Sequence, residues 1–188
     1  MAQLKPALTL ALKYEGVWSK TPGDKGGETC YGISRVYWPL WEGWHLVDAD
    51  VRSSTPIETL KNDNNLHMLV EAFYTEKFWN RIRGNWITSQ AISNELLDQA
   101  INLGVHQAVK HLQEVLNVLL NPYSIPADDL ALDGEFGPYT GEKFTIALGR
   151  RGDTIITNML NAFQAAYYVE RIRKNPMSRK FLGWFTRV

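Results

Sequence analysis

Two carboxylates and a hydroxyl stand in the order Glu15, Asp24 and Thr29 near the start of the sequence. Hydrolysis of a glycosidic bond needs a carboxylic acid that protonates the bridging oxygen and a second carboxylate on the other side of the bond. In the inverting form of the reaction, the second carboxylate holds the attacking water. Residues of these types within one short segment make acid-catalysed glycoside hydrolysis a candidate chemistry.

The position of Glu15 suits the proton donor. Glu15 continues the apolar stripe of a helix that we predict over residues 3–15, and Gly16 marks the end of that helix. A carboxyl group at such a place is partly desolvated, which favours its protonated form. The alternative is a glutamate at a frayed helix end that turns to solvent or pairs with an arginine.

Asp24 and Thr29 lie in a glycine-rich segment, residues 16–34, which we predict as an ordered loop or a short hairpin. An aspartate on such a loop can position the attacking water, with the threonine hydroxyl assisting. An aspartate between glycines is equally typical of a tight turn, so that interpretation stays open.

The sequence resembles the glycoside hydrolase family 108 N-acetylmuramidases, which occur among phage endolysins and bacterial wall-remodelling proteins. The matching motifs follow the family order over nearly the whole chain. They are Glu15-Gly16-Val17-Trp18, Asp24-Lys25-Gly26-Gly27-Glu28-Thr29, Tyr31-Gly32-Ile33, Tyr74 with Phe78-Trp79, Asp98–Gly104, Leu112-Gln113, Leu132–Thr140 and Phe181–Val188. Val17 and Trp18 depart from the Gly-Tyr of the family, which affects the wall of the cleft beside Glu15.

The resemblance implies a peptidoglycan hydrolase that cleaves the MurNAc-β-1,4-GlcNAc bond without a metal or another cofactor. It implies Glu15 as the general acid, with Asp24 and Thr29 positioning the water. The expected setting is a phage endolysin that acts on peptidoglycan with a holin-type pore or an export partner. The alternative from another class is a non-catalytic wall-binding or secretion-assisting protein with the same fold.

Four further residues are candidates for substrate contact: Trp18, Tyr31, Gln99 and Asn102. Each has a structural alternative. Tyr31 could hold the loop instead of the sugar, the two amides could cap or solvate their helix, and a tryptophan is most often a core residue. The role of the Trp38–Trp44 segment stays open.

Apolar residues at helical spacing predict a mainly α, lysozyme-like fold with a Gly-rich loop or small β-hairpin near the N-terminus. The helical segments that we predict after the first are residues 55–81 with a break, 91–103, 107–120, 138–148 and 153–173. The Trp-rich stretch with Trp38, Trp41 and Trp44 leads into a polar segment that we predict as loop up to about residue 54. We predict a catalytic lobe at 1–90 and a peptidoglycan-binding-like half at 91–188, packed as one unit.

Composition narrows the functional classes. The 188 residues carry a formal net charge of zero, which argues against the broad basic surface of a nucleic-acid binder. Cys30 is the only cysteine, so no intramolecular disulfide forms, and it has no recognisable nucleophile context. No signal peptide or membrane span is evident. We expect a monomer made in the cytoplasm, without stable membrane insertion, that reaches the periplasmic wall after release or export.

Overall fold

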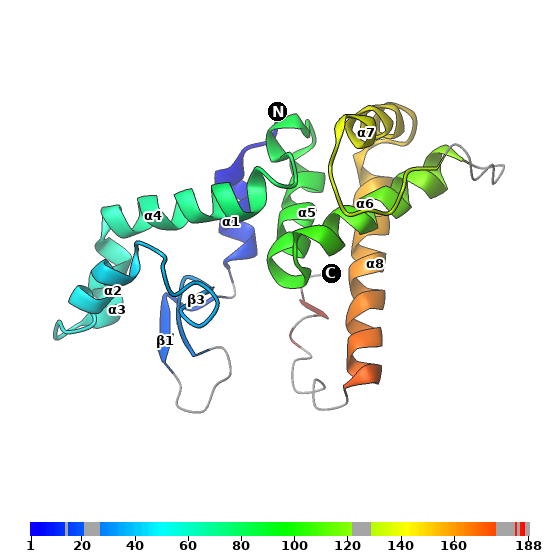
Figure 1. Cartoon of the computed structure of the whole chain (residues 1–188). Helices are drawn as coiled ribbons and strands as arrows, with labels where there is room; N and C mark the ends of the chain where they lie inside the picture. The colour runs from blue at the N-terminus through cyan, green and yellow to red at the C-terminus, as the bar shows by residue number, and fades with distance from the viewer. Residues whose placement is uncertain (14, 21–26, 122–128, 176–182, 184, 187–188) are drawn as a thin grey trace. The chain divides into compact units, whose positions relative to one another are not determined.

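The computed structural model describes the chain except residues 14, 21–26, 122–128, 176–182, 184 and 187–188. It is mainly α and lysozyme-like, with a small antiparallel sheet near the N-terminus, as the sequence predicted (Figure 1). The chain forms two compact units: Leu8–Lys77, here called the sheet-bearing unit, and Met1–Ala7 with Phe78–Val188, here called the helical unit. The functional division at residue 90 stays a prediction.

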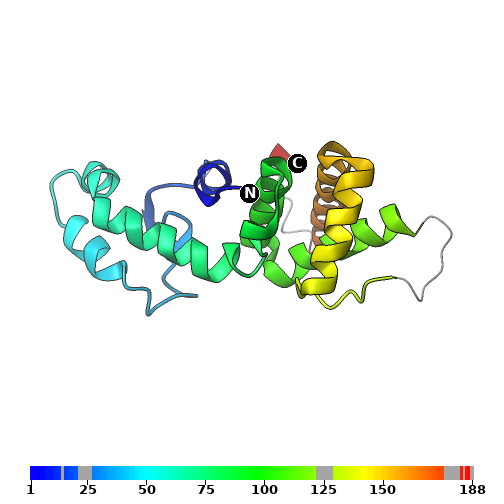
Figure 2. The same ribbon diagram turned by 90° about the horizontal axis from the view of Figure 1, so that it is seen from above.

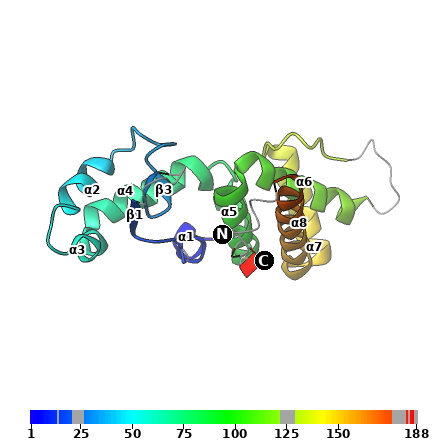
Figure 3. The same cartoon turned by 90° about the horizontal axis from the view of Figure 1, so that it is seen from below.

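The sheet-bearing unit combines three short strands with short helices. Its elements are α1 (Leu4–Ala11), β1 (Trp18–Lys20), β2 (Glu28–Cys30), β3 (Ile33–Ser34), α2 (Trp44–Asp50), α3 (Pro56–Asn62) and α4 (Asn64–Tyr74). The first of them, α1, begins four residues before the unit does, at Leu4. The strands pair antiparallel in the order β1-β2-β3, with Ser19 opposite Thr29 and Cys30 opposite Ile33. Helices α2 and α3 contact each other, and Figure 3 shows them beside one another.

Helix α1 ends earlier than the sequence predicted. Its last regular bond runs from Leu12 N to Leu8 O at 2.9 Å. The next two bonds span only three residues, from Lys13 N to Leu10 O at 3.2 Å and from Glu15 N to Leu12 O at 2.9 Å. This tightening is common at helix ends. Glu15 therefore lies in a turn just past the helix, not in its last turn.

Helix α2 falls in a stretch that we predicted as loop. Only Trp44 and Val47 are buried among its seven residues, so it shows too little periodicity to be recognised. The predicted break in the next helical region is confirmed at Asp63, whose carboxylate accepts bonds from the backbone N–H groups of Asn65 and Leu66 at the start of α4.

The helical unit packs four long helices around one apolar core. After the π-helix η1 (Thr75–Trp79), its elements are η2 (Gly84–Trp86), α5 (Gln90–Leu103), α6 (Val105–Leu120), α7 (Pro138–Arg151) and α8 (Asp153–Lys174). Helix α5 contacts α6 and α8, and α7 contacts the same two helices (Figure 2). The predicted helices from residue 91 onward are thus confirmed. Among the described residues, every helix is too short or too polar to cross a membrane.

Candidate active site

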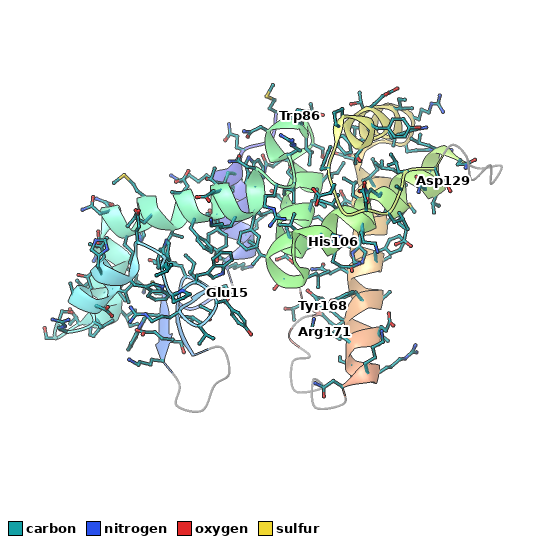
Figure 4. The ribbon with its side chains drawn as sticks, viewed as in Figure 1. Glu15, Trp86, His106, Asp129, Tyr168 and Arg171 are labelled. Atoms are coloured by element: carbon teal, nitrogen blue, oxygen red, sulfur yellow. The ribbon has the colours of Figure 1, made fainter. Side chains whose placement is uncertain are left out.

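Glu15 packs against a tight turn that joins β2 to β3. The turn is formed by Tyr31 and Gly32, both with positive φ, at 47° and 76°. A Cβ atom added to Gly32 would lie 3.4 Å from Glu15 Cγ and 3.5 Å from its carboxyl carbon. The half-buried Glu15 side chain therefore rests on the backbone of this turn, within the sheet-bearing unit (Figure 4).

Buried Tyr74 supports this turn from α4. Its phenol donates a 2.8 Å hydrogen bond to the backbone carbonyl of Tyr31. Burial, followed by the nearby Glu15 carboxylate, raises the pKa of the Tyr74 phenol. Tyr74 thus stays a neutral donor across the physiological range, which holds the left-handed Tyr31 in place. The family motif contained Tyr74, but sequence reasoning did not place it in the site.

Tyr31 also joins the site through its side chain. Its phenol oxygen lies 2.9 Å from His67 Nε2, a hydrogen bond at the surface of the unit, and the two rings meet edge to face at 5.5 Å. Burial raises the pKa of the Tyr31 phenol, so it too remains protonated at neutral pH. Sequence reasoning missed His67. The available signal was its spacing, because His67 and Tyr74 are seven residues apart on one helix face.

Trp18 and Thr29 lie on paired strands of the sheet. The Trp18 indole donates a 2.9 Å bond to the buried Glu28 carboxylate. The same carboxylate forms an ion pair with Arg35, whose Nη1 lies 3.3 Å from Glu28 Oε2. This pairing fixes the half-buried Trp18 ring in β1. Thr29, in the middle of β2, alternates with buried Glu28 and Cys30, so its side chain faces the other side of the sheet. Asp24 lies outside the described residues.

Gln99 and Asn102 belong to α5 in the helical unit. Gln99 is fully buried; its amide donates to Glu95 Oε1 at 2.7 Å and to the Leu160 carbonyl at 2.9 Å, while its oxygen accepts from His111 Nδ1 at 2.7 Å. A sugar contact by Gln99 would require it to leave this core.

Asn102 lies in a different environment. It is half-buried and donates a 2.8 Å bond to the Asp98 carbonyl. It lines a cavity of about 90 Å³ with Tyr168 and Arg171 of α8, which Figure 4 labels. A role in contact with the wall stays a prediction for this residue.

Cys30 is a packing residue. Its side chain is fully buried, and burial, with a smaller contribution from the Glu28 carboxylate, raises the pKa of the thiol to about 12. A thiol of this kind is not a nucleophile near neutral pH. In the described part of the chain, no three His, Cys, Asp or Glu side chains gather where they could hold a metal ion.

Replacing Gly32 should disturb Glu15 directly. In Gly32→Ala, the new Cβ would meet Tyr74 Oη at 3.0 Å and Glu15 Cγ at 3.4 Å, at a φ that disfavours side chains. We expect a stability loss of about 1–2 kcal/mol and at least about tenfold slower hydrolysis, because misplaced catalytic groups lose rate steeply. Denaturant unfolding and initial lysis rates measure both effects.

Gly16→Ala provides the matched control for this substitution. Among the residues that the structure describes, a Cβ at Gly16 meets nothing within 4 Å, and the φ of Gly16 lies outside the left-handed region. The expectation for Gly32 would be refuted if the two alanine variants had equal activity.

Comparison with known proteins adds independent evidence. The family model described as glycosyl hydrolase 108 matches residues 8–104. The solved structure of SagA from Brucella abortus is similar in fold, with a TM-score of 0.58 and 24% identity, covering 93% of this chain and 87% of that one. No curated protein matches the chain. Because the family match covers more than half of the chain and includes Glu15, Tyr31 and Tyr74, this protein belongs to the glycosyl hydrolase 108 family.

Proposed function

We propose that the protein is an N-acetylmuramidase that cleaves the MurNAc-β-1,4-GlcNAc bond of peptidoglycan, with Glu15 as the general acid. As a member of its family the chain is a glycoside hydrolase, and the family supports a function in peptidoglycan hydrolysis. The observation that carries the proposal is the half-buried Glu15 carboxyl, packed on the Tyr31–Gly32 turn beside the neutral Tyr74 phenol.

The proposed mechanism needs two proton movements. The Glu15 carboxyl gives its proton to the glycosidic oxygen while the bond to the sugar breaks. Asp24, assisted by the Thr29 hydroxyl, orients a water for attack on the anomeric carbon and accepts its proton. The sequence supports these two roles through the order of the residues in the family motif.

Product analysis tests the proposed bond. Digested peptidoglycan should show new reducing muramic acid ends in mass spectrometry, because the water adds to the muramic acid side of the bond. Activity should survive a chelator, since the two proposed carboxylates suffice for the reaction. New reducing glucosamine ends or new free amino groups would refute the muramidase assignment.

The two assisting residues should rank below Glu15 in importance. Asp24→Asn removes the charge that positions the water, and Thr29→Ala removes only a hydroxyl that assists. We expect Asp24→Asn to slow hydrolysis less than Glu15→Gln, and Thr29→Ala to slow it less again. Initial lysis rates of the three variants give the order. A Thr29→Ala variant slower than Asp24→Asn would contradict the assigned roles.

The biological setting is also a proposal. The motif resemblance supports a phage endolysin that reaches the wall with a holin-type pore or an export partner and acts as a monomer. The same resemblance supports wall contacts from residues 91–188, for which Asn102 is the candidate side chain. The absence of lysis by a folded chain that still binds peptidoglycan would favour the non-catalytic alternative.

A further inference from the structure

A pocket in the sheet-bearing unit is lined by residues other than those of the Glu15 site. It has a volume of about 430 Å³ and is formed by residues 37–42 together with one side of α4 and the two charged residues after it. This is the Trp-rich segment whose role the sequence left open. The volume falls in the range of small-molecule sites.

The walls of this pocket are aromatic rings that hold one another in place. The Trp38 and Phe73 rings meet edge to face, with their centres 5.0 Å apart. The centre of the Trp41 ring lies 6.2 Å from that of Phe73 and 5.1 Å from that of Trp44. The Trp44 indole donates a 2.7 Å bond to the Trp38 carbonyl. These contacts fix the rings before any ligand arrives, which lowers the entropic cost of binding.

The pocket leaves apolar surface in water. Trp38 is 36% exposed, Tyr37 is 72% exposed and Leu40 is 94% exposed. A contiguous apolar patch of this kind is typical of a binding surface. Its occupant must therefore present an apolar face to the rings.

Charged groups of both signs complete the lining of the pocket. The Lys77 ammonium lies 2.6 Å from the Glu76 carboxylate and 5.8 Å from the centre of the Trp38 ring. Glu42 adds a further carboxylate. This lining offers donors and acceptors but is not strongly basic, so it does not favour an anionic membrane surface or a polyanion.

A pyranose ring fits both requirements. One face of such a ring carries C–H bonds that stack on aromatic rings, and its edge carries hydroxyl and acetamido groups that bond to charged side chains. Packed rings also link the pocket to the Tyr31–Gly32 turn, because the centres of the Phe73 and Tyr74 rings are 5.3 Å apart and Tyr74 bonds to Tyr31. A glycan strand bound at Glu15 therefore has an aromatic surface within the same unit.

We propose that this pocket is a second subsite, which binds an N-acetylated pyranose of the glycan strand away from the bond that is cleaved. The inference rests on the proposed function for its natural ligand. Its role is to anchor the strand through the Trp38 and Trp41 rings, with Glu42 and Lys77 bonding to the polar edge of the sugar.

Two substitutions test the subsite in opposite ways. Trp38→Ala removes a wall, whereas Ala72→Phe fills the pocket from an exposed position on α4 and leaves the walls intact. The probe is the soluble tetramer of N-acetylglucosamine, titrated by calorimetry against proteins that also carry Glu15→Gln. We expect each pocket variant to weaken binding by about threefold to tenfold, the effect of losing one aromatic stacking contact.

Met68→Phe is the matched control. It adds the same ring to the same helix at a position that is 63% exposed and outside the pocket, so binding should stay within about twofold. The inference would be overturned by a tetramer that fails to bind, or that binds both pocket variants as tightly as the protein without a pocket substitution. If Ala72→Phe changed self-association without changing tetramer binding, the inference would also be overturned. The pocket would then be a contact between copies of the chain.

Lysis by the wild-type chain tests the proposed function separately. If lysis is normal and neither pocket substitution changes tetramer binding, the subsite is refuted and the proposed function is not. If the pocket substitutions weaken tetramer binding but the wild-type chain does not lyse peptidoglycan, the muramidase function is refuted and the pocket is supported as a sugar site.

Discussion

Glu15→Gln is expected to reduce peptidoglycan hydrolysis by a factor at or above the top of the range of about 10²–10⁴ that general acids contribute. The amide keeps the size of the side chain, so its packing against Gly32 should persist. It has no acidic proton to give to the leaving oxygen, and a sugar alkoxide is a poor leaving group without that proton. Initial lysis rates at matched protein concentration measure the loss.

Binding and a matched control make this result specific. Co-sedimentation with insoluble peptidoglycan should be unchanged in Glu15→Gln, because the substitution alters the chemistry and not the surface. Glu71→Gln makes the same chemical change at an exposed position of α4 and should retain wild-type activity. If Glu15→Gln retained more than about a tenth of wild-type activity, the loss would be smaller than the contribution of a general acid. That result would exclude this mechanism.

Glu95→Gln is expected to stabilise the protein at alkaline pH and not at acidic pH. Glu95 is buried in α5, and burial raises the pKa of its carboxyl to about 7 from a usual 4.5. The folded state therefore holds the proton more tightly than the unfolded state, and stability is lost as pH rises from about 4.5 through 7. Relative to wild type, the variant should gain roughly 3 kcal/mol between pH 4.5 and pH 8.

His111 should show the opposite dependence. It is buried beside Gln99, and burial, with a smaller effect of Lys110, lowers the pKa of the imidazole from 6.5 to about 4. The folded state holds the proton less tightly, so stability is present above pH 6.5 and is lost as pH falls toward 4. His111→Asn keeps a donor for Gln99 and should gain stability at acidic pH only.

Urea unfolding at pH 4, 6 and 8, followed by circular dichroism, separates the two effects. The wild-type contributions of Glu95 and His111 have opposite slopes between pH 4.5 and 6.5, so they offset each other there. A stability difference that is constant with pH in both variants would show that these groups titrate alike in the folded and unfolded chain.

Local patterns in the sequence were enough to predict most helices. The α5, α6, α7 and α8 helices begin and end within a few residues of the predicted bounds, because each carries an apolar stripe at helical spacing. The glycines of residues 16–34 predicted a loop or a small hairpin there, where the structure has a three-stranded sheet, and the apolar stripe placed Glu15 near a helix end. Short elements were harder, and α2 was missed because seven residues with two buried side chains carry little periodic signal.

The tertiary structure decided which polar residues are buried and which meet at the site. Its sequence position allows Gln99 to contact a sugar. In the structure, α6 and α8 cover its helix and form hydrogen bonds with its amide. Tyr31, His67 and Tyr74 meet because α4 packs against the β2–β3 turn, a contact between segments about 40 residues apart. Sequence periodicity shows which face of an element is apolar, but the partner that covers that face comes from distant parts of the chain.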